Sequence, residues 1–141
     1  MYALALTTTV VLACLSLLHV YWAAGGVAGI DSVIPTVDGK RTLDPSPLAS
    51  VVVATALAVA AAVVFASTGT LRSVAPMWFV RVGLVVLAMV FLARAIGDFR
   101  MIGFTKRIRD TRFARMDYLV FSPLCASLSI ACGTLAVYGT P

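Results

Sequence analysis

The stretch Arg94–Asp117, RAIGDFRMIGFTKRIRDTRFARMD, organises the rest of this chain. It begins inside an apolar segment, passes an Arg and an Asp four residues apart, and ends in a dense run of cations. Away from it in both directions the sequence is mostly apolar. A hydrophobic segment that runs into a cluster of Lys and Arg is typical of a membrane helix ending at a basic loop.

The composition places the whole chain in a membrane. Of its 141 residues, 61% are hydrophobic and only 12% are charged, whereas a soluble domain carries about 25% charged residues. We therefore expect an integral membrane protein with a single domain over residues 1–141. The net charge of +5 then indicates membrane lipids as partners and no nucleic acid. A chain of this size is also compatible with a homo-oligomer.

Four apolar runs are each about as long as the 20 residues that span a bilayer. They predict helices at about 3–24, 48–68, 76–97 and 118–138. The fold class is therefore all-α, an integral membrane antiparallel four-helix bundle. In the fourth run, residues spaced by four, three, four and three predict one helix–helix seam, formed by Tyr118, Ser122, Cys125, Ser129 and Cys132.

The distribution of cations predicts the orientation. The loops 25–47 and 98–117 lie on the same side of such a bundle and hold eight of the eleven Lys and Arg residues. Because basic loops stay in the cytoplasm, we expect both long loops inside the cell membrane and both termini outside. Within the first loop, Asp38 and Gly39 predict a tight turn.

Several polar side chains are expected together at the cytoplasmic ends of the helices. Ionisable groups in membrane helices usually face the bundle interior and pair with one another. Arg94 and Asp98 are four residues apart and share a helix face. We predict a ligand-binding pocket whose candidate residues are His19, Trp22, Arg94, Asp98, Asp117 and Tyr118.

Two interpretations of this pocket remain open. In the functional one, Arg94 binds an anionic group, Asp98 orients Arg94 or exchanges a proton, and His19 is the acid–base group because its ordinary pKa lies near neutrality. In the structural one, Arg94 and Asp98 form a helix-end ion pair and His19 is a donor to a neighbouring helix.

The basic segment 99–115 also has two interpretations. It is either a topology signal that lies on anionic headgroups or a lid that recognises phosphate. The candidate contacts to lipid headgroups are Arg100, Lys106, Arg107, Arg109, Arg112 and Arg115. We expect no metal and no cofactor, because one His and three scattered Cys give neither paired haem ligands nor a zinc spacing.

Three functions follow from these patterns, and whether the protein is an enzyme stays open. The leading hypothesis is a multi-pass membrane protein that binds a lipid-like or anionic ligand in a cytoplasm-facing polar pocket. The alternative is a membrane enzyme acting on a lipid or isoprenoid, with His19 or Asp98 as the acid–base group. The third is a small transporter or channel subunit, although no helix is clearly broken near its midpoint.

Motifs along nearly the whole chain resemble one protein family. They are HVYWAAGG (His19–Gly26), VIPTVDG (Val33–Gly39), RAIGDFR (Arg94–Arg100), RFARMD (Arg112–Asp117) and SPLC (Ser122–Cys125). In combination they resemble the small bacterial membrane proteins grouped as domain of unknown function 3995. The resemblance implies four membrane helices in the same order and no particular activity. The motifs coincide with the side of the bundle where the pocket is predicted.

Overall fold

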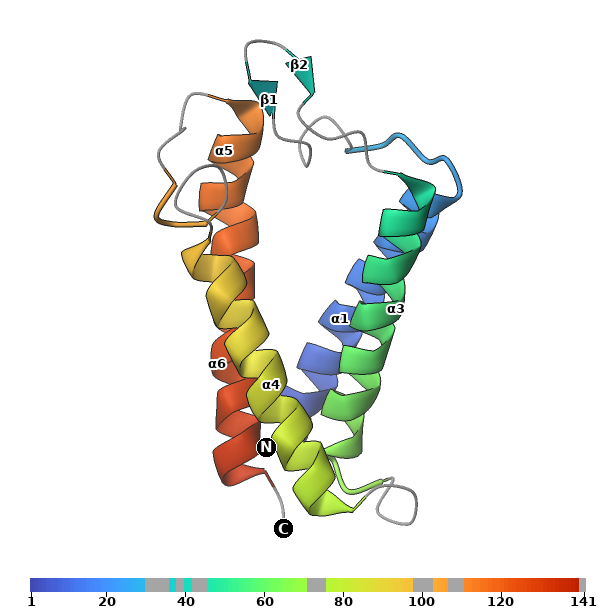
Figure 1. Ribbon diagram of the computed structural model, residues 1–141. Helices are drawn as coiled ribbons and strands as arrows, with labels where there is room; N and C mark the ends of the chain where they lie inside the picture. The colour runs from blue at the N-terminus through green and yellow to red at the C-terminus, as the bar shows by residue number, and fades with distance from the viewer. Residues whose placement is uncertain are drawn as a thin grey trace.

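The chain folds as a bundle of four membrane-length helices, seen here in a computed structural model (Figure 1). The structure describes residues 1–29, 36–37, 40–41, 46–70, 76–97, 103–106 and 111–139. The first three long helices are α1 (Tyr2–Ala23), α3 (Pro47–Ala66) and α4 (Met77–Ile96). The fourth runs without a break over Arg112–Tyr138. All four are long and apolar enough to cross a membrane, which confirms the predicted fold class.

The helices pack chiefly in two antiparallel pairs, α1 with α3 and α4 with the fourth helix. The pairs lie close together at the end that holds both chain termini and spread apart at the other end, so that the molecule resembles a V (Figure 1). Gly83 lies where α4 approaches α3, and any side chain there would meet Val63 Cγ1 at 2.9 Å. The largest fully buried apolar side chains of the core are Leu12, Val64, Leu84 and Leu135.

Small polar side chains tie each pair together. Ser16 Oγ of α1 donates a hydrogen bond to the Ala54 carbonyl of α3 at 2.8 Å. In the other pair, Ser129 Oγ donates to the Ala88 carbonyl of α4, also at 2.8 Å. Small side chains at such contacts let helix backbones approach closely, and their hydroxyls supply hydrogen bonds where water is scarce.

The outer faces of the helices are strongly apolar. Large hydrophobic side chains that are more than half exposed occur on every long helix, among them Leu17, Val52, Met89 and Ile130. A soluble protein rarely leaves so much apolar surface in water. These faces are therefore suited to contact with lipid.

Local signals in the sequence account for where the helices begin. Ser46 caps α3, its Oγ accepting from the Ala49 amide at 3.1 Å, and Pro47 occupies the first helical position. The ends of α1, α3 and α4 lie within two residues of the predicted 3–24, 48–68 and 76–97.

The fourth helix differs from its prediction. It was expected at 118–138, but it starts six residues earlier and consists of α5 (Arg112–Met116), η1 (Asp117–Phe121) and α6 (Ser122–Tyr138). The reason is local: Thr111 Oγ1 accepts from the Ala114 amide at 3.0 Å and caps the helix. The last part of the predicted basic loop is therefore helical.

Two minimal strands lie in the first long connection, β1 (Thr36–Val37) and β2 (Lys40–Arg41). They pair antiparallel, Thr36 with Arg41 and Val37 with Lys40. This is the pairing that a tight turn between them requires, although Asp38 and Gly39 themselves lie outside the described residues. The strands β1 and β2 and the start of α5 lie at the same end of the molecule, opposite both termini (Figure 1), as the predicted topology requires.

Candidate functional site

The polar centre of the loop end is the carboxylate of Asp117, which has no exposed surface. Its Oδ1 accepts a hydrogen bond from Arg94 Nη2 at 2.9 Å. Its Oδ2 accepts from Lys106 Nζ at 2.7 Å and from the Gly103 amide at 2.7 Å. A buried charge is tolerable only when it is paired and hydrogen-bonded, and Asp117 meets both conditions.

The segment 103–106 is fixed on the end of α4 by backbone hydrogen bonds. The Phe104 amide donates to the Ala95 carbonyl at 2.9 Å, and the Thr105 amide and hydroxyl both donate to the Ile96 carbonyl, at 3.3 and 2.6 Å. These bonds satisfy carbonyls that a helix end would otherwise leave unpaired. Gly103 is required here because its φ is +85° and any side chain would meet the backbone of Ile96. The segment thereby carries Lys106 to Asp117.

A π-helical turn sets the orientation of Asp117. In η1 the Ser122 amide donates to the carbonyl of Asp117, five residues earlier. Pro123 follows at once, and since proline has no amide hydrogen and its ring crowds the carbonyl four residues earlier, it disturbs ordinary α-helical bonding at this point. The extra residue in the turn places Asp117 in line with Ser122 on the side that packs against α4.

This turn corrects the predicted seam of the fourth helix. Ser122 and Cys132 are fully buried and Ser129 nearly so, as the spacing predicted, and Cys125 is half-buried. Tyr118, the predicted first member, is instead 52% exposed. The spacing argument assumed α-helical geometry throughout, and one added residue in η1 puts Asp117 in the seam and turns Tyr118 outward.

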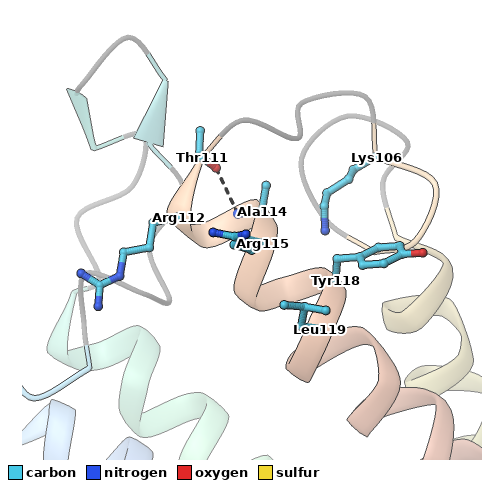
Figure 2. A pocket seen from close by; sticks show the side chains of 7 residues that line it. All are labelled: Lys106, Thr111, Arg112, Ala114, Arg115, Tyr118 and Leu119. Atoms are coloured by element: carbon cyan, nitrogen blue, oxygen red, sulfur yellow. Dashed lines mark hydrogen bonds between the residues drawn. The ribbon is translucent and has the colours of Figure 1, made fainter.

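Beside this ion cluster lies an open cavity of about 740 Å³ (Figure 2). Its basic lining residues are Lys106, Arg112 and Arg115; in Figure 2 Arg115 lies between the other two. Arg112 and Arg115 are exposed, whereas the side chain of Lys106 is only 2% exposed. The remaining described lining residues are Thr111, Ala114, Tyr118 and Leu119. We call this feature the basic cavity.

Tyr118 joins the basic cavity to the ion cluster. The Lys106 ammonium lies 5.8 Å from the centre of the Tyr118 ring, within the range of a cation–π contact. Phe104 packs edge-on against the same ring, with 5.8 Å between ring centres. The rings of Phe104 and Tyr118 therefore pack beside Lys106 and help to fix its position in the cavity wall.

The structure thus brings together one part of the predicted pocket: Arg94, Asp117 and Tyr118, with the predicted headgroup contacts Lys106, Arg112 and Arg115. Arg94 pairs with Asp117, a partner that the sequence did not suggest, and the predicted pair of Arg94 with Asp98 stays a prediction. Asp98 lies outside the described residues, as do Arg100, Arg107 and Arg109. A ligand-binding role for any of these residues remains a prediction.

His19 and Trp22 form a separate group at the end of α1, on the other helix pair. His19 Nδ1 donates to the Leu15 carbonyl at 2.8 Å, and its ring meets that of Trp22 edge-on at 5.0 Å. Trp22 Nε1 donates to the Ala28 carbonyl at 2.9 Å. The partner of His19 therefore lies in its own helix, not in a neighbouring helix as the structural interpretation supposed.

Sequence reasoning missed three residues that build the site. Thr111 starts the helix, Pro123 accompanies the π turn, and Gly103 permits the close approach to α4. Thr111 was detectable as a capping residue, and Pro123 as a helix-disturbing residue inside an apolar run. Gly103 carried no comparable signal, because its contact is with residues that only the fold brings near.

Two buried polar atoms in this region have no hydrogen-bond partner, Arg94 Nη1 and Ser122 Oγ, among the residues that the structure describes. Within the same residues, no three His, Cys, Asp or Glu side chains lie close enough to hold a metal ion.

Comparison with known proteins identifies a family. Residues 12–132 match the family model described as "Protein of unknown function (DUF3995)". This confirms the resemblance inferred from the sequence motifs. No curated protein and no solved structure matches the chain.

Proposed function

The chain belongs to the DUF3995 family, and from its basic cavity we propose that it is a membrane protein that binds an anionic, lipid-like ligand at the loop end of the bundle. The observation that carries the proposal is the composition of the cavity wall. Lys106, Arg112 and Arg115 contribute to it, and no described acidic residue does. Among the described lining residues, an anion would therefore meet cations, neutral donors and apolar side chains.

Two exposed cations at the cavity support an anionic ligand. Asp117, the one carboxylate among the described residues, is fully buried and already engaged by Arg94, Lys106 and the Gly103 amide. Arg112 and Arg115 are exposed and line the cavity, so their positive charge favours an anion there.

The position of the cavity along its helix supports a ligand at the membrane surface. The fourth helix has 27 residues, and at about 1.5 Å per residue it is roughly 40 Å long. The hydrocarbon core of a bilayer is about 30 Å thick. With its C-terminal end at one face, the first two turns, which carry Arg112, Arg115 and Tyr118, would project into the headgroup region.

The orientation completes the proposal. Eight of the eleven Lys and Arg residues fall within residues 25–47 and 98–117, and the described parts of these segments lie at one end of the bundle. We propose that this end faces the cytoplasm, so the basic cavity would meet ligands of the inner leaflet. The enzyme and transporter hypotheses remain open, and no contact of His19 favours either.

The test is native mass spectrometry of the protein released from mild detergent and titrated with phosphatidylglycerol, phosphatidic acid or inorganic phosphate. We expect at least one of these anions to bind the wild type, and Arg115→Gln to weaken that binding about tenfold, as loss of one charge-assisted hydrogen bond would. Arg81→Gln is the matched control, because Arg81 is exposed near the opposite end of α4.

The outcomes separate clearly. Weakening by Arg115→Gln and not by Arg81→Gln would support the cavity as the binding site. If none of the three anions bound the wild type, or if both variants weakened binding equally, the proposal would be overturned. Because Arg112 and Arg115 are exposed, their replacement should leave the helical circular dichroism signal unchanged, which checks that the variants are folded.

A further inference from the structure

We infer that the ligand of the basic cavity is a lipid whose headgroup ends in a phosphate monoester. This inference rests on the proposed function and narrows it to one chemical class. It is argued from the order of side chains along the cavity and from the donors that its exposed arginines present.

The cavity wall changes character along the axis of the fourth helix. Thr111, Arg112 and Arg115 lie in the first turn and a half, and Tyr118 and Leu119 lie one turn further toward the apolar α6 (Figure 2). Tyr118 and Leu119 are 52% and 62% exposed. A molecule that fills the whole cavity must therefore be charged at one end and apolar at the other. A lipid has this shape, whereas a free phosphate ion would use only the upper part.

The donors in the upper part suit phosphate oxygens. Arg112 and Arg115 each present a planar fork of N–H groups, which matches two oxygens of one phosphate. Lys106 lines the same cavity, but its ammonium is held by Asp117 at 2.7 Å, so Arg112 and Arg115 are the exposed donors. A phosphate monoester carries about −1.5 to −2 charges near neutral pH, and its three terminal oxygens give these donors more acceptors than a phosphodiester offers.

The charge of the lining also argues against zwitterionic headgroups. An ethanolamine or choline group needs a carboxylate or an aromatic cage for its cation. No acidic residue lines the cavity among the described residues, and Asp117 lies buried behind Lys106 with both oxygens engaged. An amine in the headgroup would therefore lie beside the exposed guanidinium groups of Arg112 and Arg115, whereas a terminal phosphate brings no positive charge.

The experiment compares four probes on the wild-type protein by native mass spectrometry in mild detergent. Dioleoyl phosphatidic acid has the terminal phosphate, dioleoyl phosphatidylglycerol is an anionic phosphodiester, and dioleoyl phosphatidylethanolamine is zwitterionic. Glycerol 3-phosphate carries the same phosphate without a tail. We expect phosphatidic acid to be retained about tenfold more than either other lipid, as one additional charge-assisted contact would produce. We expect glycerol 3-phosphate to compete poorly.

Matched variants test both ends of the site. Arg115→Gln should abolish the preference for phosphatidic acid over phosphatidylglycerol, and Arg81→Gln should preserve it. Leu119→Asn should weaken the binding of phosphatidic acid about fivefold, because it removes an apolar contact with the acyl chain of the lipid. Ile130→Asn, an equal change at an exposed position of α6 outside the described lining of the cavity, should not.

Each alternative result has a distinct meaning. Equal retention of phosphatidic acid and phosphatidylglycerol would overturn the inference and leave a general anion site. Glycerol 3-phosphate that displaced phosphatidic acid at equal concentration would also overturn it, since the source would then be a soluble phosphate. If no anion bound at all, the proposed function itself would fail.

Discussion

At the scale of single residues, Asp117 has the largest set of polar contacts at the described loop end. Its carboxylate accepts from Arg94, Lys106 and the Gly103 amide, and these donors come from α4 and from the segment that caps α4. Asp117 is not among the described residues that line the basic cavity. Its evident effect is to hold Lys106, and thereby the cavity wall, in place.

Replacing Asp117 by Ala should lower the free energy of unfolding by about 3 kcal/mol or more. The reason is that the Lys106 side chain, only 2% exposed, would keep a buried charge without its carboxylate. Thermal unfolding in detergent, followed by circular dichroism, measures the effect. The double variant Asp117→Leu/Lys106→Met removes both charges and should regain much of the loss. A single Ala variant as stable as the wild type would contradict this account of the cluster.

At the scale of elements, the directions of the side chains on the fourth helix depend on the one extra residue in the π turn η1. The turn η1 closes on a hydrogen bond from the Ser122 amide to Asp117, which keeps both residues on the face toward α4. Within the turn the helix exposes Tyr118 to the cavity, and after it Ser129 and Cys132 lie in the buried seam. A π turn is in effect a one-residue insertion into an α-helix, so its removal has a predictable geometric effect.

Deleting Val120 together with Pro123→Ala should convert η1 into an ordinary α-helical turn. Asp117 and Ser122 would then be four residues apart and still share one face. We expect the thermal midpoint in detergent to stay close to that of the wild type. Deletion of the exposed residue Ser127 is the matched control. This deletion rotates the part of the helix before residue 127 by about 100° relative to the part after it, which should break the Asp117 contacts. The prediction fails if both deletions destabilise the protein equally.

At the scale of the whole molecule, the two helix pairs meet at the end with the termini and spread apart at the loop end (Figure 1). The described part of the loop end holds the ion cluster on one pair and the His19–Trp22 contact on the other. The predicted pocket is thereby divided between two arms. The basic cavity depends only on the described residues of the arm formed by α4 and the fourth helix.

The proposed orientation predicts opposite signals from two reporter fusions. Alkaline phosphatase, which is active only outside the cytoplasm, should be active when fused after Pro141 and inactive when fused after Gly29. The reason is that residues 25–47 and 98–117 hold eight of the eleven Lys and Arg residues and should stay inside. A fluorescent protein that folds only in the cytoplasm should give the inverse pattern. Phosphatase activity at Gly29 alone would reverse the orientation.

Much of the architecture follows from local sequence. Apolar run length predicted α1, α3 and α4 to within two residues, because a span depends on the number of consecutive apolar residues and not on their partners. The start of the fourth helix at Arg112 was missed, since basic residues were taken as a loop although Thr111 offered a cap. For the site, spacing along one helix could not reveal the pair of Arg94 with Asp117, which lie 23 positions apart, and the pair of Arg94 with Asp98 that spacing did suggest lies outside the described residues.

What the sequence alone determined is therefore the four membrane-length helices, the grouping of both long connections at one end, and the excess of cations there. The tertiary structure decided that Arg94 reaches Asp117, 23 positions along the chain, that Tyr118 leaves the seam for the cavity, and that His19 lies on the other arm. The physical reason is that the length of an apolar segment and the charge of a loop depend only on residues that are neighbours in the sequence. An ion pair between distant residues depends instead on which helices pack together and on the rotation that one π turn adds to a helix.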